Sequence, residues 1–292
     1  MKIYMKPPIQ KVTSSIITIF LNFNEREKLH TNPALMRLND EWIILMRHKM
    51  GVSNLLISRL NDDFIVKEMK WFDTKPFQDK YEWGAEDPRL FWHNDKLHFI
   101  YHGTRNNSIR TIIGEVNEHL SPEPAQTEIS YDPGPEKNWT FFSYAGEQYA
   151  VNSFAPKFKV VKITNGIATN YSVSNNPAFP WKYGEARGGT PAIRVGEHFY
   201  TVFQSHVIQN NWPRYYCAAF AKFSAKPPFN VKAITGPVLL PDEYRDWGYS
   251  VVFPAGLQLH DGKWFISYGH MDNECRIGIF DFDKVEGLFH KV

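Results

Sequence analysis

Charged side chains of both signs surround a proline in the stretch GAEDPRLF, residues 84–91. Glu86 and Asp87 are carboxylates that can exchange protons with a substrate, and Arg89 can orient a carboxylate or bind hydroxyl groups. The stretch leads into an apolar run typical of a β-strand. An Asp-Pro turn alone would explain the pair as local structure, because the residue before proline favours extended geometry. A chemical role for Glu86 and Asp87 therefore depends on whether the rest of the chain supplies other functional side chains near them.

Composition excludes several classes of function. The 292 residues include 33 Lys and Arg and 31 Asp and Glu, without a basic block, so no nucleic-acid partner is predicted. Two cysteines, Cys217 and Cys275, are too few for a disulfide framework and fit a reducing compartment. The first residues lack a signal-peptide pattern, and no apolar run approaches the roughly 20 residues of a membrane span. We therefore expect a cytoplasmic protein without a membrane span.

Short β-rich runs, such as EWIILM, KLHFIYH, HFYTVF and KWFISY, are bounded by Gly, Asn, Asp and Pro. Long stripes of apolar residues at a period of 3.6 are absent, which argues against a helical bundle or an alternating α/β fold. The sequence predicts an all-β protein.

A turn of one kind begins several of these runs. We take one residue of each turn as its anchor: Asp40, Asp95, Gly146, Gly196 and Gly262. These anchors lie 55, 51, 50 and 66 residues apart, close to the length of a four-stranded propeller blade. Five repeats predict a five-bladed β-propeller that forms one domain over residues 1–292. The blades are expected near residues 32–60, 86–120, 137–175, 187–235 and 250–285.

Polar residues recur at a fixed place relative to these turns. Eight residues before the anchors stand Asn32, Asp87, Asn138, Gly188 and Pro254. The inner strands of a propeller surround one axis, so these positions are expected to converge. The hairpins that follow also end in polar side chains: Arg47, His102, Asn152, Ser153, His206, Tyr268 and Asp272. Together they predict a polar pocket with aromatic walls that suits a hydroxyl-rich ligand.

Glycoside cleavage commonly uses two carboxyl groups, one of them as the acid toward the departing oxygen. Asp87 is the natural acid, and the residues leave the second carboxylate open between Asp272 and Glu185. The cations Lys137, Arg187 and His206 are able to hold a phosphate, which needs no enzymatic base as a nucleophile. Strand alternation predicts that Asp87 faces the axis, that Glu86 points away and that Arg89 returns to the side of Asp87.

Six motifs in order carry a family resemblance: NPA, GAEDPRLF, EKNW, the His of QSHV, VVFPAGL and SYGHMD. Over residues 30–285 the chain resembles the β-mannoside phosphorylases and related hydrolases of glycoside hydrolase family 130, and the similar mannosyltransferase-phosphorylases. The resemblance implies a five-bladed propeller and an inverting reaction with Asp87 as general acid, acting directly or through a sugar hydroxyl. It also implies that Lys137 and His206 bind phosphate. Asn152 and Ser153 stand where phosphorylases usually carry an arginine.

The sequence thus predicts a β-mannoside phosphorylase or mannosyltransferase that acts on a small-molecule or oligosaccharide substrate. Phosphate or a sugar 1-phosphate is the expected co-substrate, without a further cofactor or a metal. Predicted phosphate ligands are Lys137, Arg187 and His206, and predicted substrate ligands are Asn32, Arg47, Glu86, Arg89, Asn138, Tyr268 and Asp272. Alternatives are an inverting hydrolase, a non-catalytic carbohydrate-binding propeller, and a nucleotide-sugar transferase with Asp281 and Asp283 on a metal. Sugar identity and oligomeric state stay open.

Overall fold

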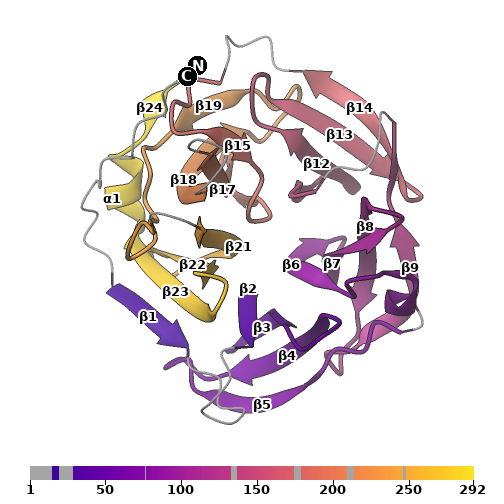
Figure 1. The fold of residues 1–292 in the computed structure, drawn as a ribbon. Helices are drawn as coiled ribbons and strands as arrows, with labels where there is room; N and C mark the ends of the chain where they lie inside the picture. The colour runs from indigo at the N-terminus through magenta and orange to yellow at the C-terminus, as the bar shows by residue number, and fades with distance from the viewer. Residues whose placement is uncertain are drawn as a thin grey trace.

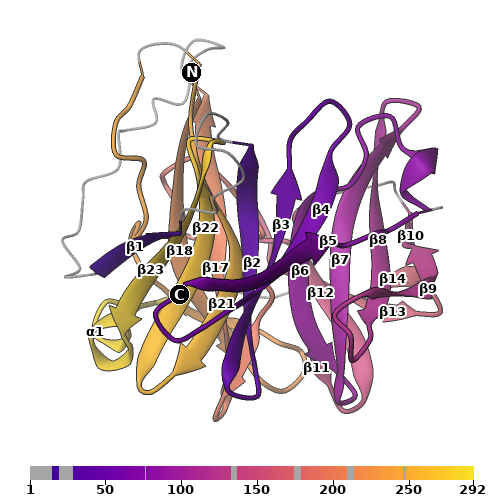
Figure 2. The same cartoon turned by 90° about the horizontal axis from the view of Figure 1, so that it is seen from below.

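Five sheets stand around a central axis in the computed structural model of the chain (Figure 1). The structure describes residues 15–19, 29–75, 77–132, 137–173, 179–208, 214–245 and 248–292. Seen from the side, the inner strands run along the axis (Figure 2). The predicted all-β propeller is confirmed, and that the whole chain is one domain stays a prediction.

Each sheet is built mainly from consecutive antiparallel strands. The first blade contains β2 (His30–Leu38), β3 (Glu41–His48), β4 (Asn54–Leu60) and β5 (Val66–Trp71). A short 3-10 helix, η1 (Gln78–Lys80), leads to the second blade. That blade contains β6 (Glu86–His93), β7 (Lys96–Arg105), β8 (Ser108–Val116) and β9 (Pro122–Glu128). The third blade contains β10 (Ser130–Tyr131), β11 (Thr140–Tyr144), β12 (Glu147–Ser153), β13 (Lys159–Thr164) and β14 (Ile167–Val173).

The last two blades also use the ends of the chain. The fourth contains β15 (Glu185–Arg187), β16 (Ile193–Val195), β17 (His198–Ile208), β18 (Arg214–Ser224), β19 (Val231–Ile234), β20 (Tyr249–Ser250) and β24 (His290–Lys291). The fifth contains β1 (Ser15–Ile19), β21 (Val252–His260), β22 (Lys263–His270) and β23 (Glu274–Asp281), followed by helix α1 (Phe282–Glu286). The predicted ranges 32–60 and 86–120 stop short, because they leave out the outermost strands β5 and β9.

The five predicted anchors all lie in the turn between the first long hairpin strands of each blade. Several turn residues have positive φ: Asn39, Asn94, Asp95, Ala145, Gly146, Gly196, Asp261 and Gly262. Tight hairpin turns need this backbone region, which Gly, Asn and Asp enter at low cost. The sequence pattern therefore marked the turns correctly.

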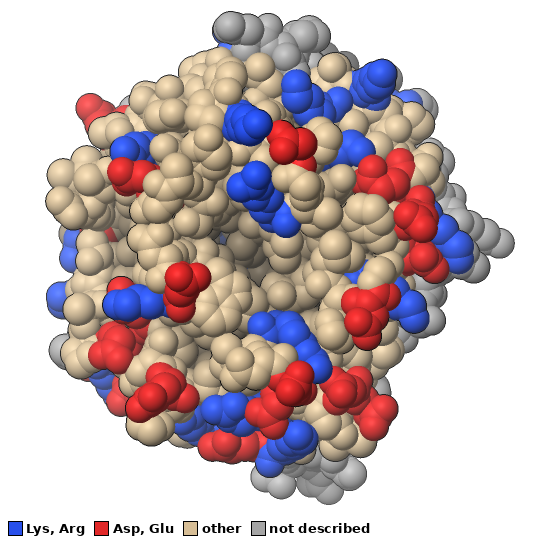
Figure 3. Space-filling model, turned by 180° about the vertical axis from the view of Figure 1, so that it is seen from behind, with Lys and Arg blue, Asp and Glu red and all other residues tan. Residues whose placement is uncertain are grey.

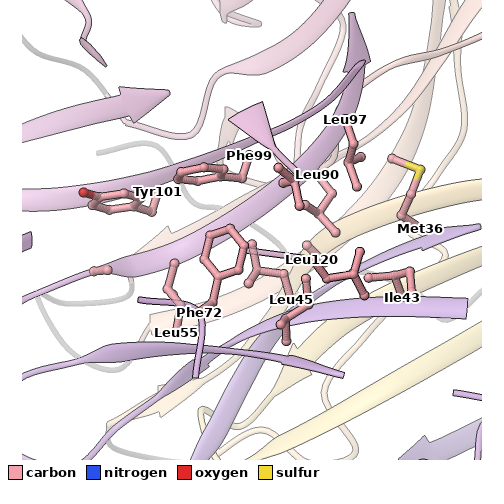
Figure 4. Packing of buried hydrophobic residues seen from close by; sticks show 14 of the residues in the cluster. Met36, Ile43, Leu45, Leu55, Phe72, Leu90, Leu97, Phe99, Tyr101 and Leu120 are labelled. Atoms are coloured by element: carbon pink, nitrogen blue, oxygen red, sulfur yellow. The ribbon is translucent and has the colours of Figure 1, made fainter. Parts of the chain in front are cut away.

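Side-chain alternation along the strands fills the space between neighbouring blades. In β3, Ile43 and Leu45 join the cluster shared with the second blade, whereas Trp42 and Ile44 join the cluster shared with the fifth. Figure 4 shows the first of these interfaces, where Leu45 packs toward Phe72. Among the described residues five such clusters join the five blades in a ring.

Charged residues of both signs are interspersed around the face seen in Figure 3, which is hollowed at its centre. No single-sign field that would attract a polyanion covers this face. In the described part of the chain, no helix has the length and apolar character needed to cross a bilayer.

Candidate active site

Three positions eight residues before the hairpin turns share an unusual backbone conformation. Asn32, Asp87 and Asn138 have φ values of 53°, 51° and 64°. The pairing register with the neighbouring strand shifts across Asn32 in β2 and across Asp87 in β6. Such a bulge re-aims the side chain that it carries. The repeat seen in the sequence is thus a repeated backbone geometry.

The predicted positions also approach one another around the axis. The Asn32 amide donates a hydrogen bond from Nδ2 to Oδ1 of Asp87 at 2.6 Å, which links the first two blades. A side chain at Gly188 would collide with the carbonyl oxygen of Asn138, so the third and fourth blades need glycine to meet this closely. Pro254 lies against Gly189 in the same way, between the fourth and fifth blades. The expected convergence on the axis is confirmed.

Asp87 is a buried carboxylate held among cations. Its Oδ1 atom accepts the Asn32 bond and lies 3.7 Å from a guanidinium nitrogen of Arg47. Burial on its own raises the pKa of Asp87, but positive charges, with Arg47 and Lys137 the strongest, outweigh it and hold the pKa below the usual Asp value. Asp87 is therefore ionised at neutral pH in the ligand-free protein.

Glu86 does not point away from Asp87, so the prediction from strand alternation is wrong. Arg47 forms an ion pair with the Glu86 carboxylate and also lies beside Asp87. The positive φ and the bulge at Asp87 interrupt the alternation on which the prediction rested. Burial, and then the charge of Asp87, raise the pKa of Glu86 above its ordinary value. Adjacent carboxylates thus share one guanidinium, and their pKa values move in opposite directions.

Arg89 is a structural residue, contrary to the prediction that it binds sugar. Its side chain is 1% exposed and donates to the carbonyl oxygens of Asp87 (2.8 Å) and Pro88 (3.0 Å). Its Nε atom donates to the carbonyl of Gly189 at 2.5 Å, and its guanidinium lies over the ring of Phe253. Burial lowers its pKa to about 10, where it is still a cation at neutral pH. Arg89 ties the second blade to the fourth, and its Nη2 atom has no hydrogen-bond partner among the described residues.

A third carboxylate, Asp272, belongs to the same electrostatic cluster. Burial raises its pKa most, Lys49 opposes this, and the charge of Asp87 raises it further. Lys49 also donates to the backbone carbonyl of Asp272 at 2.6 Å. The sequence prediction missed Lys49, although it lies two residues beyond Arg47 in the same run of basic residues.

An open cavity of about 400 Å³ lies where the second, third and fourth blades meet. Its lining includes Lys137, Asn138, Asn152, Ser153, Glu185 and Arg187. Arg187 is engaged by Glu185 in a two-point ion pair with distances of 3.0 and 2.9 Å. Lys137 has no ion-pair partner among the described residues. The predicted anion ligands Lys137 and Arg187 thus share a cavity, but a carboxylate neutralises one of them.

Two histidines border this region in their neutral form. Burial lowers the pKa of His206, followed by the charge of Arg187, and its Nε2 atom lies 3.7 Å from Glu185. Burial lowers the pKa of His102 to about 3. The backbone N–H of Asn138 donates to Nε2 of His102 at 3.4 Å, and the other ring nitrogen lies 3.1 Å from the Thr111 hydroxyl. His206 therefore carries no positive charge at neutral pH.

Tyr268, a predicted substrate ligand, lies in a buried environment. It is 2% exposed and packs in the apolar cluster between the fourth and fifth blades. The sequence places Tyr268 correctly near a strand end but cannot give the side to which its side chain points.

Asp281 and Asp283 lie at the end of β23 and in α1, at the outer edge of Figure 1. No cluster of three or more His, Cys, Asp or Glu suited to a metal occurs among the residues that the structure describes.

Neither a protein-family model nor a curated protein matches the sequence. Solved structures do match. One is the β-1,2-mannobiose phosphorylase from Listeria innocua, at a TM-score of 0.68 and 16% identity, with 96% of this chain and 94% of that chain covered. The mannose phosphorylase MPT-4 from Leishmania mexicana, solved with a phosphate ion, matches at 0.61 and 12%, with 96% and 92% covered.

A third match is a structure from work on the GH130 family of mannoside phosphorylases and its β-1,2-mannoside hydrolases. Its TM-score is 0.64 and its identity 17%, over 86% of this chain and 84% of that chain. The chain shares its fold with these three structures. The resemblance drawn from the sequence motifs is confirmed at the level of fold, and both hydrolases and phosphorylases share it.

Proposed function

We propose that this protein is an inverting carbohydrate-active enzyme that cleaves or forms β-mannosidic bonds, with phosphate or a sugar 1-phosphate as co-substrate. The main observation in support of the proposal is that a cluster of carboxylates lies next to a cavity that contains a lysine. Glu86, Asp87 and Asp272 form a carboxylate cluster, and Lys137 acts electrostatically on all three while it lines the adjacent cavity. A saccharide and an anion can therefore bind side by side.

In the cleavage direction, a phosphate oxygen attacks the anomeric carbon from the face opposite the glycosidic bond. The bond between that carbon and the glycosidic oxygen breaks, and the departing oxygen takes the proton of Asp87. The products are a sugar 1-phosphate of inverted configuration and the released sugar. Synthesis reverses each step, so Asp87 then removes the proton of the acceptor hydroxyl.

The charge state of Asp87 suits the synthetic direction in the ligand-free enzyme. Its depressed pKa leaves a carboxylate ready to accept a proton at neutral pH. Cleavage needs the protonated form, which becomes more populated as the pH falls. A phosphate bound at Lys137 would offset the positive charge that depresses this pKa, so the anion also favours the acid form.

Inverting hydrolysis is the second candidate, and one contact favours it. Glu185 holds Arg187 in a two-point ion pair inside the cavity and so competes with phosphate for that guanidinium. With Asn152 and Ser153 on the same wall, the anion has Lys137 as its main cation. A water molecule needs no such charge.

Product analysis decides between the two candidates. We would incubate the enzyme with β-1,2-mannobiose with and without phosphate and follow the anomeric protons by NMR. The proposal expects mannose 1-phosphate only when phosphate is present. Release of mannose at the same rate without phosphate would instead identify a hydrolase. Inactivity on β-mannosides with either co-substrate, together with turnover of a nucleotide sugar, would overturn both.

A further inference from the structure

The loop that leads into Glu86 presents a large apolar side chain to solvent. Trp83 is 61% exposed, although it stands only three residues before Glu86. The neighbouring loop adds two further exposed apolar side chains, Met50 at 66% and Val52 at 51%. Among the described residues no aromatic or cationic side chain stacks on the Trp83 ring. We call Met50, Val52 and Trp83 the apolar platform.

Backbone contacts fix the two loops of the apolar platform to each other. The Ser53 N–H donates to the carbonyl of Trp83 at 3.0 Å, and the Ala85 N–H donates to the carbonyl of Ser53 at 2.9 Å. Gly84, with φ of 73°, allows this approach, because a Cβ there would collide with the Ser53 carbonyl oxygen and crowd Val52. The Trp83 backbone is thus held in place before any ligand binds.

The same loops are joined to the carboxylate cluster. The hydroxyl of Ser53 accepts a hydrogen bond from Nε of Arg47 at 2.9 Å. Arg47 in turn pairs with Glu86 and lies beside Asp87. Two short links therefore connect the apolar platform to the group that would exchange a proton with the glycosidic oxygen. The backbone that carries the exposed indole is thus joined to the candidate site by hydrogen bonds.

We infer that Trp83 is a saccharide subsite, on which a third sugar unit, next to the two joined by the cleaved bond, stacks its apolar ring face. Pyranose rings present a C–H face of this kind, and aromatic side chains bind apolar faces while their edges remain hydrated. The inference rests on the proposed function and narrows the substrate class: it selects oligosaccharides of three or more units over disaccharides. Binding to such a platform needs little loop ordering, which limits its entropic cost.

A matched pair of tryptophans provides the test. Trp92 is also exposed, at 42%, but it lies at the other end of β6, next to the hairpin turn. We would titrate wild type, Trp83→Ala, Trp83→Phe and Trp92→Ala with β-1,2-mannobiose and with β-1,2-mannotetraose by calorimetry. Because calorimetry needs no turnover, a failure of the proposed reaction would not hide the result.

We expect Trp83→Ala to weaken tetraose binding by about three- to tenfold, with little change for the disaccharide. Trp83→Phe should retain most of the affinity, and Trp92→Ala should match wild type. Equal affinity of wild type and Trp83→Ala for the tetraose would overturn the subsite. Equal weakening for both sugars would also overturn it, since that result would mean damage to the whole site. If wild type binds neither sugar, the proposed mannoside specificity fails as well, and the same titration with β-1,4-linked tetrasaccharides tests the subsite alone.

Discussion

The two sides of the candidate site hold their charges differently. On the side of the first two blades, Asp87 is buried, hydrogen-bonded to Asn32 and surrounded by cations. On the side of the fourth blade, Arg187 and Glu185 pair with each other at the edge of an open cavity, where both are more than a third exposed. A buried, satisfied group has one arrangement, whereas an exposed ion pair of about 0–1 kcal/mol is easily opened. In the proposed reaction, the first side, called the fixed side below, carries the proton transfer, and the second, called the exposed side, selects the co-substrate.

The largest effect is expected at the fixed side. Asp87→Asn keeps the shape of the side chain and removes the proton carrier, so turnover should fall by about 10²–10⁴. The melting temperature at neutral pH should fall modestly, because the amide can still accept the Asn32 bond but loses the attraction to Arg47 and Lys137. Steady-state kinetics and thermal melts would measure this, with Asp95→Asn in a distant turn as the control. Full activity of the variant would remove Asp87 from the mechanism.

Arg89 tests whether the fixed side owes its rigidity to a buried cation. Arg89→Met leaves three carbonyl oxygens without their donor and should cost roughly 2–5 kcal/mol of unfolding free energy. Arg187→Met, at the exposed side, should change it by less than about 0.5 kcal/mol. Urea denaturation gives both values. A normal unfolding free energy for Arg89→Met with a raised KM would instead return Arg89 to the sugar ligands.

Two substitutions at the exposed side should change phosphate affinity in opposite directions. Lys137→Ala removes a charge-assisted contact and should weaken phosphate binding about ten- to hundredfold. Glu185→Gln frees Arg187 and should tighten binding by up to about fivefold, in line with the small strength of an exposed ion pair. Calorimetry with inorganic phosphate measures both. If neither variant differs from wild type, the cavity does not bind phosphate.

The smallest expected effect concerns pH and sets Glu86 against Asp87. Burial, then the Asp87 charge, raise the pKa of Glu86 in the folded state, so its ionisation opposes folding above its usual value of 4.5. Glu86→Gln should therefore gain stability between pH 4 and pH 7, by about 1–3 °C in Tm. The ionisation of Asp87 has the opposite effect on stability, because its pKa is lowered in the folded state. It stabilises the fold above the ordinary pKa of 3.8, and this stabilisation is lost as the pH falls through the folded-state pKa. Melts of wild type, Glu86→Gln and Asp87→Asn from pH 3 to pH 7 measure these differences. If the stability of Glu86→Gln relative to wild type does not rise between pH 4 and pH 7, the first expectation is wrong.

Sequence reasoning found what depends on local pattern. Turn residues such as Gly146 and Gly262 marked the hairpins, and an offset of eight residues located Asn32 and Asp87. It failed where a side chain's direction depends on an irregular backbone. The bulge at Asp87 turned Glu86 toward Arg47, and no periodicity in the sequence indicates that bulge.

Long-range partners were also beyond the sequence. Arg89 is predicted as a ligand from EDPR, yet its guanidinium reaches Gly189, a hundred residues away, and lies over the ring of Phe253. Only the closed ring brings these segments together. Glu185 differs from this case, because its ion-pair partner Arg187 lies only two residues along the same strand.

The strand β1 has a consequence for the order in which the molecule is made. It completes the fifth blade by pairing with β23, so that Ser15 lies opposite Ile279. At a synthesis rate of about 5–20 residues per second, β1 leaves the ribosome roughly 15–50 s before its partner exists. During that interval its sequence SIITI is an unpaired β-strand rich in isoleucine, which is the kind of segment that associates with other chains. A blade that is closed by β1, the first strand among the described residues, therefore keeps one open strand edge for most of the time of synthesis.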